Sequence, residues 1–268
     1  MIRRCLVALA VTALACTASA CGGSSENAKS ELQQTLQRLG GIHSGNLTLR
    51  LVVTPATGPR GRVGFAILGL FALRAHGLPM LDVRYTQTTG PHQATGRLIS
   101  DGMNAVAFVG RTRVALPASA LRQLTAGGSG NGGGIVAPLR LDSWLKNPST
   151  SDGGMVGGAE TDRISGDLDV VNAANGLTRM LRQLGRAAPT ITGGSADQLR
   201  KAVKSSSVDV WTGKRDRLLR RLLVKARLAF DVPADLKRAF GAIVGANVEF
   251  ELGIASPNQP VHVTIPAG

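Results

Sequence analysis

The sequence predicts an α+β fold in which a long antiparallel sheet carries helices on one face. Segments with alternating apolar and polar residues recur along the chain, as expected for strands with one buried face. Gly, Pro and Asx turn signals separate these segments at hairpin spacing. Only a few intervening segments show helical periodicity. The chain has 268 residues, 43% of them hydrophobic, and no linker divides its two halves. We therefore predict a single domain over residues 27–268.

The sequence of the first half of the chain predicts one helix followed by an antiparallel meander. Residues 27–40 carry three leucines at helical spacing and end in a Gly-Gly pair. The alternation of Leu47, Leu49, Leu51 and Val53 with less apolar residues predicts the first strand. An Asp101–Gly102 pair predicts a hairpin turn. Further strands are expected at 63–73, 80–88, 93–100, 103–109 and 112–116.

The second half repeats this pattern after two loops. A short helix is expected at 117–125 and a helical turn at 139–146. Residues 126–134 and 147–158 are rich in Gly and Ser, and we predict both as loops. Helices are then expected at 173–184, 196–205 and 233–244, and strands at 163–170, 208–212, 218–230, 247–255 and 261–265.

The first twenty residues have the pattern of a secretory signal peptide. Two arginines precede an apolar stretch over 5–16, which is shorter than a membrane-spanning helix needs, and small residues follow. The segment Ala18-Ser19-Ala20-Cys21 resembles the bacterial lipobox, although Ala18 stands where Leu is preferred. This resemblance implies that Cys21 carries a diacylglycerol, with acyl chains such as palmitate, and that residues 21–26 form a flexible tether. Cys16 is the alternative acylation site.

Cysteine usage and charge exclude several classes of protein. All three cysteines lie within the first 21 residues, which excludes a disulfide framework or a cysteine-ligated metal in the remainder. The 31 basic and 17 acidic residues give a net charge of +14, which falls to +12 after loss of residues 1–20. Nucleic acid is disfavoured because the chain is predicted to be exported and only 3% of its residues are aromatic. Anionic lipid headgroups, or simple solvation of the surface, remain as explanations of the charge.

No arrangement of residues indicates catalysis, a metal or a cofactor. The four histidines are scattered without metal-ligand spacing. Ser143 to Lys146 matches S-x-x-K, and Gly128 to Gly133 matches G-x-G-x-x-G, but neither motif has the context that its chemistry requires. The strand alternation places the carboxylates of Asp167, Asp169, Glu249 and Glu251 on solvent faces. The sequence therefore predicts a protein that is not an enzyme.

Four ordered segments resemble the LolA-like superfamily, in particular the LppX/LprG-type lipoproteins of actinobacteria. These are Ser44-Gly45-Asn46-Leu47-Thr48-Leu49, Ile99-Ser100-Asp101-Gly102-Met103-Asn104-Ala105, Val208-Asp209-Val210-Trp211-Thr212-Gly213-Lys214 and Ser256-Pro257-Asn258-Gln259-Pro260-Val261. The resemblance covers residues 27–266, but 117–158 and 233–245 do not align. It implies a strongly curved antiparallel half-barrel with helices on its concave face and an apolar cavity for acyl chains or lipoglycans.

The resulting hypothesis is a monomeric, lipid-anchored carrier of an amphiphile on the extracytoplasmic face of the cell membrane. The alternative is an envelope scaffold or sensor lipoprotein whose sheet binds another protein and whose core is closed. Taken singly, each candidate cavity residue is also consistent with an ordinary core position, so the cavity follows from the resemblance. The candidate cavity residues are Val63, Phe65, Ile67, Phe71, Leu177, Met180, Leu181 and Leu184.

Overall fold

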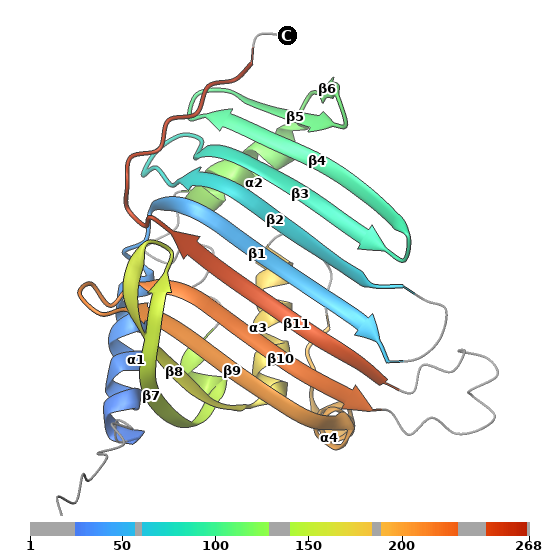
Figure 1. The fold of residues 1–268 in the computed structure, drawn as a ribbon. Coiled ribbons are helices and arrows are strands. Elements are labelled where there is room, and N and C mark those ends of the chain that lie inside the picture. Colours follow the sequence, from blue (N-terminus) through green and yellow to red (C-terminus); the bar gives the residue numbers. More distant parts are fainter. Residues whose placement is uncertain (1–24, 57–60, 129–139, 184–188, 230–244, 267–268) are drawn as a thin grey trace, which may run out of the picture.

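A computed structural model describes residues 25–56, 61–128, 140–183, 189–229 and 245–266. Within these residues, eleven strands form one antiparallel sheet that does not close into a barrel (Figure 1). Its order is β6-β5-β4-β3-β2-β1-β11-β10-β9-β8-β7. The strands are β1 (Ser44–Pro55), β2 (Val63–Ala72), β3 (Met80–Thr89), β4 (His92–Asp101), β5 (Ala105–Val109), β6 (Thr112–Val114), β7 (Leu145–Val156), β8 (Ala159–Leu168), β9 (Val203–Gly213), β10 (Leu219–Ala229) and β11 (Gly245–Ala255).

Strand β1 joins two meanders at the centre of the sheet. It pairs with β2 on one side and with β11, the last strand, on the other. The register places Leu49 opposite Ile67 of β2 and opposite Leu252 of β11. Because directly opposed residues share a face in an antiparallel pair, the apolar rows of the two halves become continuous across β1.

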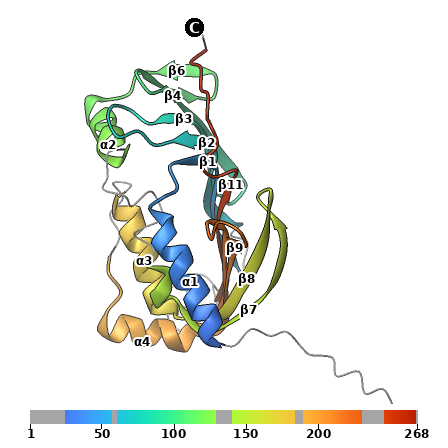
Figure 2. The same cartoon turned by 90° about the vertical axis from the view of Figure 1, so that its left-hand side faces the viewer.

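The helices lie on one face of this curved sheet, as Figure 2 shows. They are α1 (Ser25–Leu39), α2 (Ala118–Gly128), α3 (Val170–Gln183) and α4 (Gly193–Ala202), with a 3-10 turn, η2, at Leu141–Ser143. The predicted fold class, a curved antiparallel sheet with helices packed on one face, is confirmed. None of the helices in the described ranges is long and apolar enough to span a membrane.

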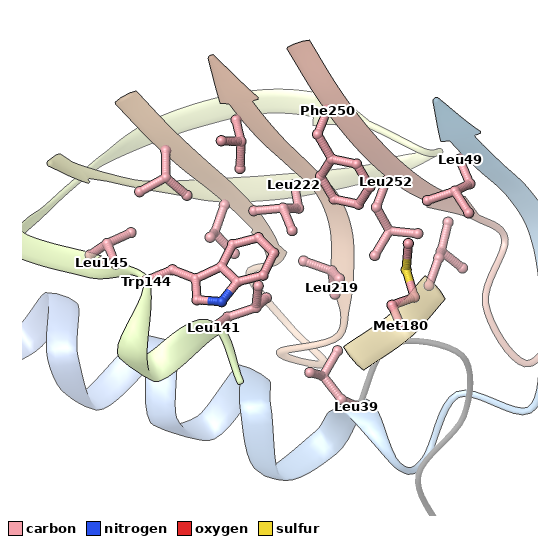
Figure 3. Packing of buried hydrophobic residues seen from close by; sticks show 14 of the residues in the cluster. Leu39, Leu49, Leu141, Trp144, Leu145, Met180, Leu219, Leu222, Phe250 and Leu252 are labelled. Atoms are coloured by element: carbon pink, nitrogen blue, oxygen red, sulfur yellow. The ribbon is translucent and has the colours of Figure 1, made fainter. Parts of the chain in front are cut away.

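The hydrophobic core lies between α1, η2, α3 and the β1–β11–β10–β9–β8 half of the sheet. Trp144, which follows η2, is 0% exposed. Its ring packs edge to face against the ring of Phe250, with the two ring centroids 6.4 Å apart (Figure 3). Leu222 and Leu252 fill the same layer and are each 0% exposed. These side chains contribute stability through the apolar area they remove from water.

Two hydroxyls fix α1 against the sheet. Thr35 of α1 and Thr212 of β9 are each 0% exposed, and their Oγ1 atoms lie 2.8 Å apart in a hydrogen bond. The Thr35 side chain also lies 2.9 Å from the carbonyl oxygen of Glu31, one helical turn earlier. A hydroxyl buried without a partner would destabilise the fold, so this bond favours one position of α1 along β9.

The prediction of a loop at 147–158 was wrong, because most of this segment belongs to β7. It pairs with β8 through two register shifts, between Lys146 and Ser149 and between Asp152 and Gly154. A Cβ on Gly153 would lie 2.9 Å from the Trp211 ring, and Gly154 has φ of 65°. The glycines therefore permit bulges and close packing inside a strand, rather than marking its absence.

The strand predicted at 261–265 was also wrong, since these residues form no ladder. They alternate between half-buried and exposed, as the sequence pattern requires. However, the segment runs past the ends of β1 to β4 instead of alongside an edge strand (Figure 1). Its backbone therefore has no parallel or antiparallel partner.

Other elements differ from expectation mainly at their boundaries. Helix α4 begins and ends three residues before the predicted 196–205, because its last turn is replaced by the start of β9. Residues 126–128 of the predicted 126–134 loop extend α2. The rest of that loop and the helix predicted at 233–244 lie outside the described residues.

Replacing Gly176 of α3 by Ala should destabilise the protein. An Ala in a helix interior normally stabilises by roughly 0.5–1 kcal/mol relative to Gly. Here the added Cβ would lie 2.5 Å from Cζ2 of the fully buried Trp144. We expect a net loss of about 1–3 kcal/mol from overpacking, measured by urea denaturation.

The control for this experiment is Gly194→Ala in α4. A Cβ added at that position would have no other atom within 4 Å of it. This substitution should be neutral or stabilising, and equal losses from both variants would contradict close packing of Trp144 on α3.

Candidate functional site

The helix side of the sheet is apolar in both halves but is fully buried in only one. Around the core, Leu49 is 1% and Leu252 is 0% exposed. On the same face, Leu51 lies opposite Phe65 and Val53 lies opposite Val63. Val63 is 47% exposed, and the other three are half-buried. The apolar surface therefore continues beyond the packed core.

We call this exposed continuation the apolar strip. Two of its rings, Phe65 and Tyr85, stack with their centroids 6.5 Å apart and their planes inclined by 25°. The Tyr85 hydroxyl lies 3.3 Å from the Gln87 side-chain oxygen. The strip thus offers an apolar body with a polar group along one border. It consists of Leu51, Val53, Val63, Phe65, Ile67 and Tyr85.

The candidate residues predicted from the sequence fall into two groups in the structure. Val63, Phe65 and Ile67 belong to the apolar strip. Phe71 and Met180 are 4% and 3% exposed and lie within the core, and the half-buried Leu177 packs against it. The side chain of Leu181 and all of Leu184 lie outside what the structure describes.

Three residues of the strip were missing from that candidate set. Leu51 and Val53 continue the alternation that begins at Leu47, so their inward orientation was visible in the sequence. Tyr85 joins the strip because the β2–β3 register places it opposite Ile67. Such pairing is a long-range property of the sheet, which alternation within one strand does not determine.

The carboxylates beside basic residues are ion-pair partners rather than acid–base groups. Two hydrogen bonds from Arg97, of 2.8 and 2.7 Å, hold the pKa of Asp82 below its usual value. A hydrogen bond and charge attraction from Lys214 likewise lower the pKa of Asp152. General acid–base chemistry near neutral pH needs a carboxyl pKa shifted upward. No three His, Cys, Asp or Glu side chains gather into a metal-binding group in the described part of the chain.

Most basic residues around 214–227 have structural partners. Arg217 bonds Asp162 at 2.6 Å, Lys214 bonds Asp152 at 2.6 Å, and Arg220 pairs with Asp216. The guanidinium groups of Arg163 and Arg221 lie 5.4 and 5.1 Å from the Trp211 ring centroid, and Arg221 also pairs with Glu251. These cations stabilise the sheet and the β7–β8 hairpin.

No family model and no curated protein sequence matches the chain significantly. Among solved structures, the chain is similar to LprF from Mycobacterium bovis, with 16% identity, a TM-score of 0.42, and coverage of 91% of this chain and 98% of that one. It is also similar to the lipoprotein LppX of Mycobacterium tuberculosis, with 15% identity, a TM-score of 0.39, and coverage of 90% and 100%. The second neighbour, LppX, bears the name of the family type that the sequence resembles.

Proposed function

We propose that this chain is a membrane-anchored lipoprotein that binds the acyl chains of an amphiphile on the helix side of its sheet. The observation that carries the proposal is the apolar strip, whose half-exposed side chains extend a core that is otherwise fully packed. Apolar surface that continues outward from a core and stays accessible is typical of a binding site.

The residues of the proposed site have distinct roles. Val63, Phe65 and Ile67 contact the acyl chain, since they are accessible apolar side chains of β2 on its helix side. Phe71, Leu177 and Met180 form the packed end against which the chain stops. Leu181 and Leu184 remain proposed acyl-chain contacts on the grounds of their helical spacing in the sequence alone. Each methylene removed from water contributes roughly 0.8 kcal/mol, so a long acyl chain needs no specific polar contact for binding.

Anchoring is assigned to Cys21, whose diacylglycerol carries two acyl chains. One acyl chain binds a membrane only marginally, whereas two anchoring signals hold a protein there stably. The described chain begins with α1, and residues 21–24 precede it directly. The anchor would hold the protein at the extracytoplasmic surface of the cell membrane. We propose that it binds its amphiphile there as a monomer.

Phe65→Arg should abolish binding of the amphiphile. The substitution places a charge in the middle of the apolar strip, where an acyl chain offers it no partner. Native mass spectrometry of the protein purified from its own envelope should show a bound lipid on the wild type and none on the variant. Circular dichroism checks that the variant is folded.

The matched control is Leu68→Arg, three residues further along the same strand. Leu68 is 45% exposed and lies on the opposite, helix-free face. This variant should keep its lipid. Two results would point to the scaffold or sensor alternative. One is a wild-type protein with no bound amphiphile, and the other is an equal loss of lipid from the Phe65→Arg and Leu68→Arg variants.

Cys21→Ala should prevent acylation and signal removal together. Mass spectrometry of the N-terminal peptide should find a diacylglycerol-modified Cys21 in the wild type. In the variant, residues 1–20 should remain attached and unmodified. Cys16→Ala is the control and should leave the modification intact; the reverse pattern would identify Cys16 as the anchor.

A further inference from the structure

An open groove with a volume of about 630 Å³ lies on the helix-free face of the sheet. Four strands contribute to it: β9, β10, β11 and β1. Four of its lining residues are basic, and only one is acidic. The basic residues are Arg50, Arg62, Lys225 and Arg227, and the acidic residue is Glu249.

The strand registers explain why these side chains share one face. Lys225 lies opposite Ser207 of β9 and opposite Glu249 of β11. Two residues along β10, Arg227 lies opposite Ser205 and Asn247. Small hydroxyl side chains on β9 thus leave space beside the long basic side chains of β10. Neighbouring Val208 and Val224 face the core, so this groove lies on the opposite side of the sheet from the apolar strip.

The cations of the groove differ from Arg97, Arg163 and Arg221 of the same face, each of which pairs with a carboxylate. Arg221 lies on the same strand as Lys225, four residues before it, and its Nε atom pairs with Oε1 of Glu251 at 2.8 Å. Within the described residues, by contrast, no hydrogen bond or ion pair involves the side chains of the four groove cations. All four are exposed, and Glu249 offsets only one of them. The groove therefore has an uncompensated charge near +3.

We propose that this groove binds the phosphate group of an anionic ligand. Arginine presents a planar fork of donors that matches phosphate oxygens, and lysine adds a compact charge. The hydroxyls of Ser205 and Ser207 and the amide of Asn247 supply further hydrogen-bond donors at the floor. Two sources carry this chemistry: the headgroup of an anionic phospholipid and a soluble phosphate. The inference is independent of acyl binding, because it concerns the opposite face.

The test uses the chain from residue 21 onward with Cys21→Ser, which keeps every described residue and removes the acyl anchor. One arm titrates inorganic phosphate and follows the backbone amide signals of β10 and β11 by NMR. The other measures binding to phosphatidylcholine vesicles with and without phosphatidylglycerol. The variant is Lys225→Gln with Arg227→Gln, which leaves both exposed positions polar.

The matched control is Arg84→Gln with Arg113→Gln, which lowers the net charge equally. Arg84 and Arg113 are exposed on the same helix-free face, outside the groove. We expect the groove variant to bind about 30-fold more weakly in the arm that shows binding. The control should change little, because its cations lie on β3 and β6.

Each result decides the proposal. Binding to anionic vesicles that phosphate displaces identifies a lipid headgroup as the source, and phosphate binding without vesicle binding identifies a soluble phosphate. Absence of binding in both arms would overturn the proposal. Equal weakening of the groove variant and the control would also overturn it, since diffuse surface charge would then account for the attraction. The groove variant should still carry its lipid in native mass spectrometry, because its substitutions lie outside the apolar strip. Failure of the groove proposal and failure of the acyl-binding proposal are therefore distinguishable.

Discussion

The need to bury one face of an open eleven-stranded sheet governs this structure. Strands β1, β2 and β8–β11 turn a row of apolar side chains toward the helices, and this row continues from β8 to β2 through β1. The helices in the described residues are short, from 10 to 15 residues. The core closes where α1, η2 and α3 meet β1 and β8–β11, with Trp144 at its centre. Farther along the same face, the row is left half-exposed.

This division gives the two halves of the sheet different properties. In the packed half, adding even one methyl group should destabilise the fold, because Trp144 lies directly against Gly176 and edge-on to Phe250. In the other half, the Phe65 and Tyr85 rings stack on each other from neighbouring strands, and both side chains stay only half-buried. An acyl chain laid on these rings would complete the burial that the protein's own side chains begin.

The sequence indicated the fold class because alternation is a local property of each strand. In β1 it correctly oriented Leu47, Leu49 and Leu51, and the Asp101 carboxylate does accept hydrogen bonds from two backbone amides in the predicted turn. It failed at residues 147–158, where pairing with β8 overrides a loop-like composition. It failed again at 261–265, where alternation is present without a neighbouring strand. In the first case the deciding factor was pairing with the next strand across a two-residue turn, and in the second it was the lack of a neighbouring strand.

The same limit explains which parts of the two candidate sites were visible in advance. Phe65 and Ile67 were identifiable from β2 alone, but Tyr85 required the β2–β3 register. The basic residues near 214–227 were evident as a group, yet the sequence does not distinguish Arg217, which two carboxylates neutralise, from Arg227, which none of the described carboxylates contacts. Only the positions of Glu31 and Asp162 in space make that distinction.

Strand β1 places the two surfaces back to back. Arg50 points into the basic groove, and the next residue, Leu51, belongs to the apolar strip on the other face. Adjacent residues of a strand face opposite ways, so the sheet itself, one backbone layer thick, separates a charged surface from an apolar one. An amphiphile cannot reach both through this layer. If both proposals hold, the groove binds its anion as a separate ligand or headgroup and the strip binds the acyl chain. Substitutions at Arg50 and Leu51 should then affect different ligands, although the two residues are neighbours in the chain.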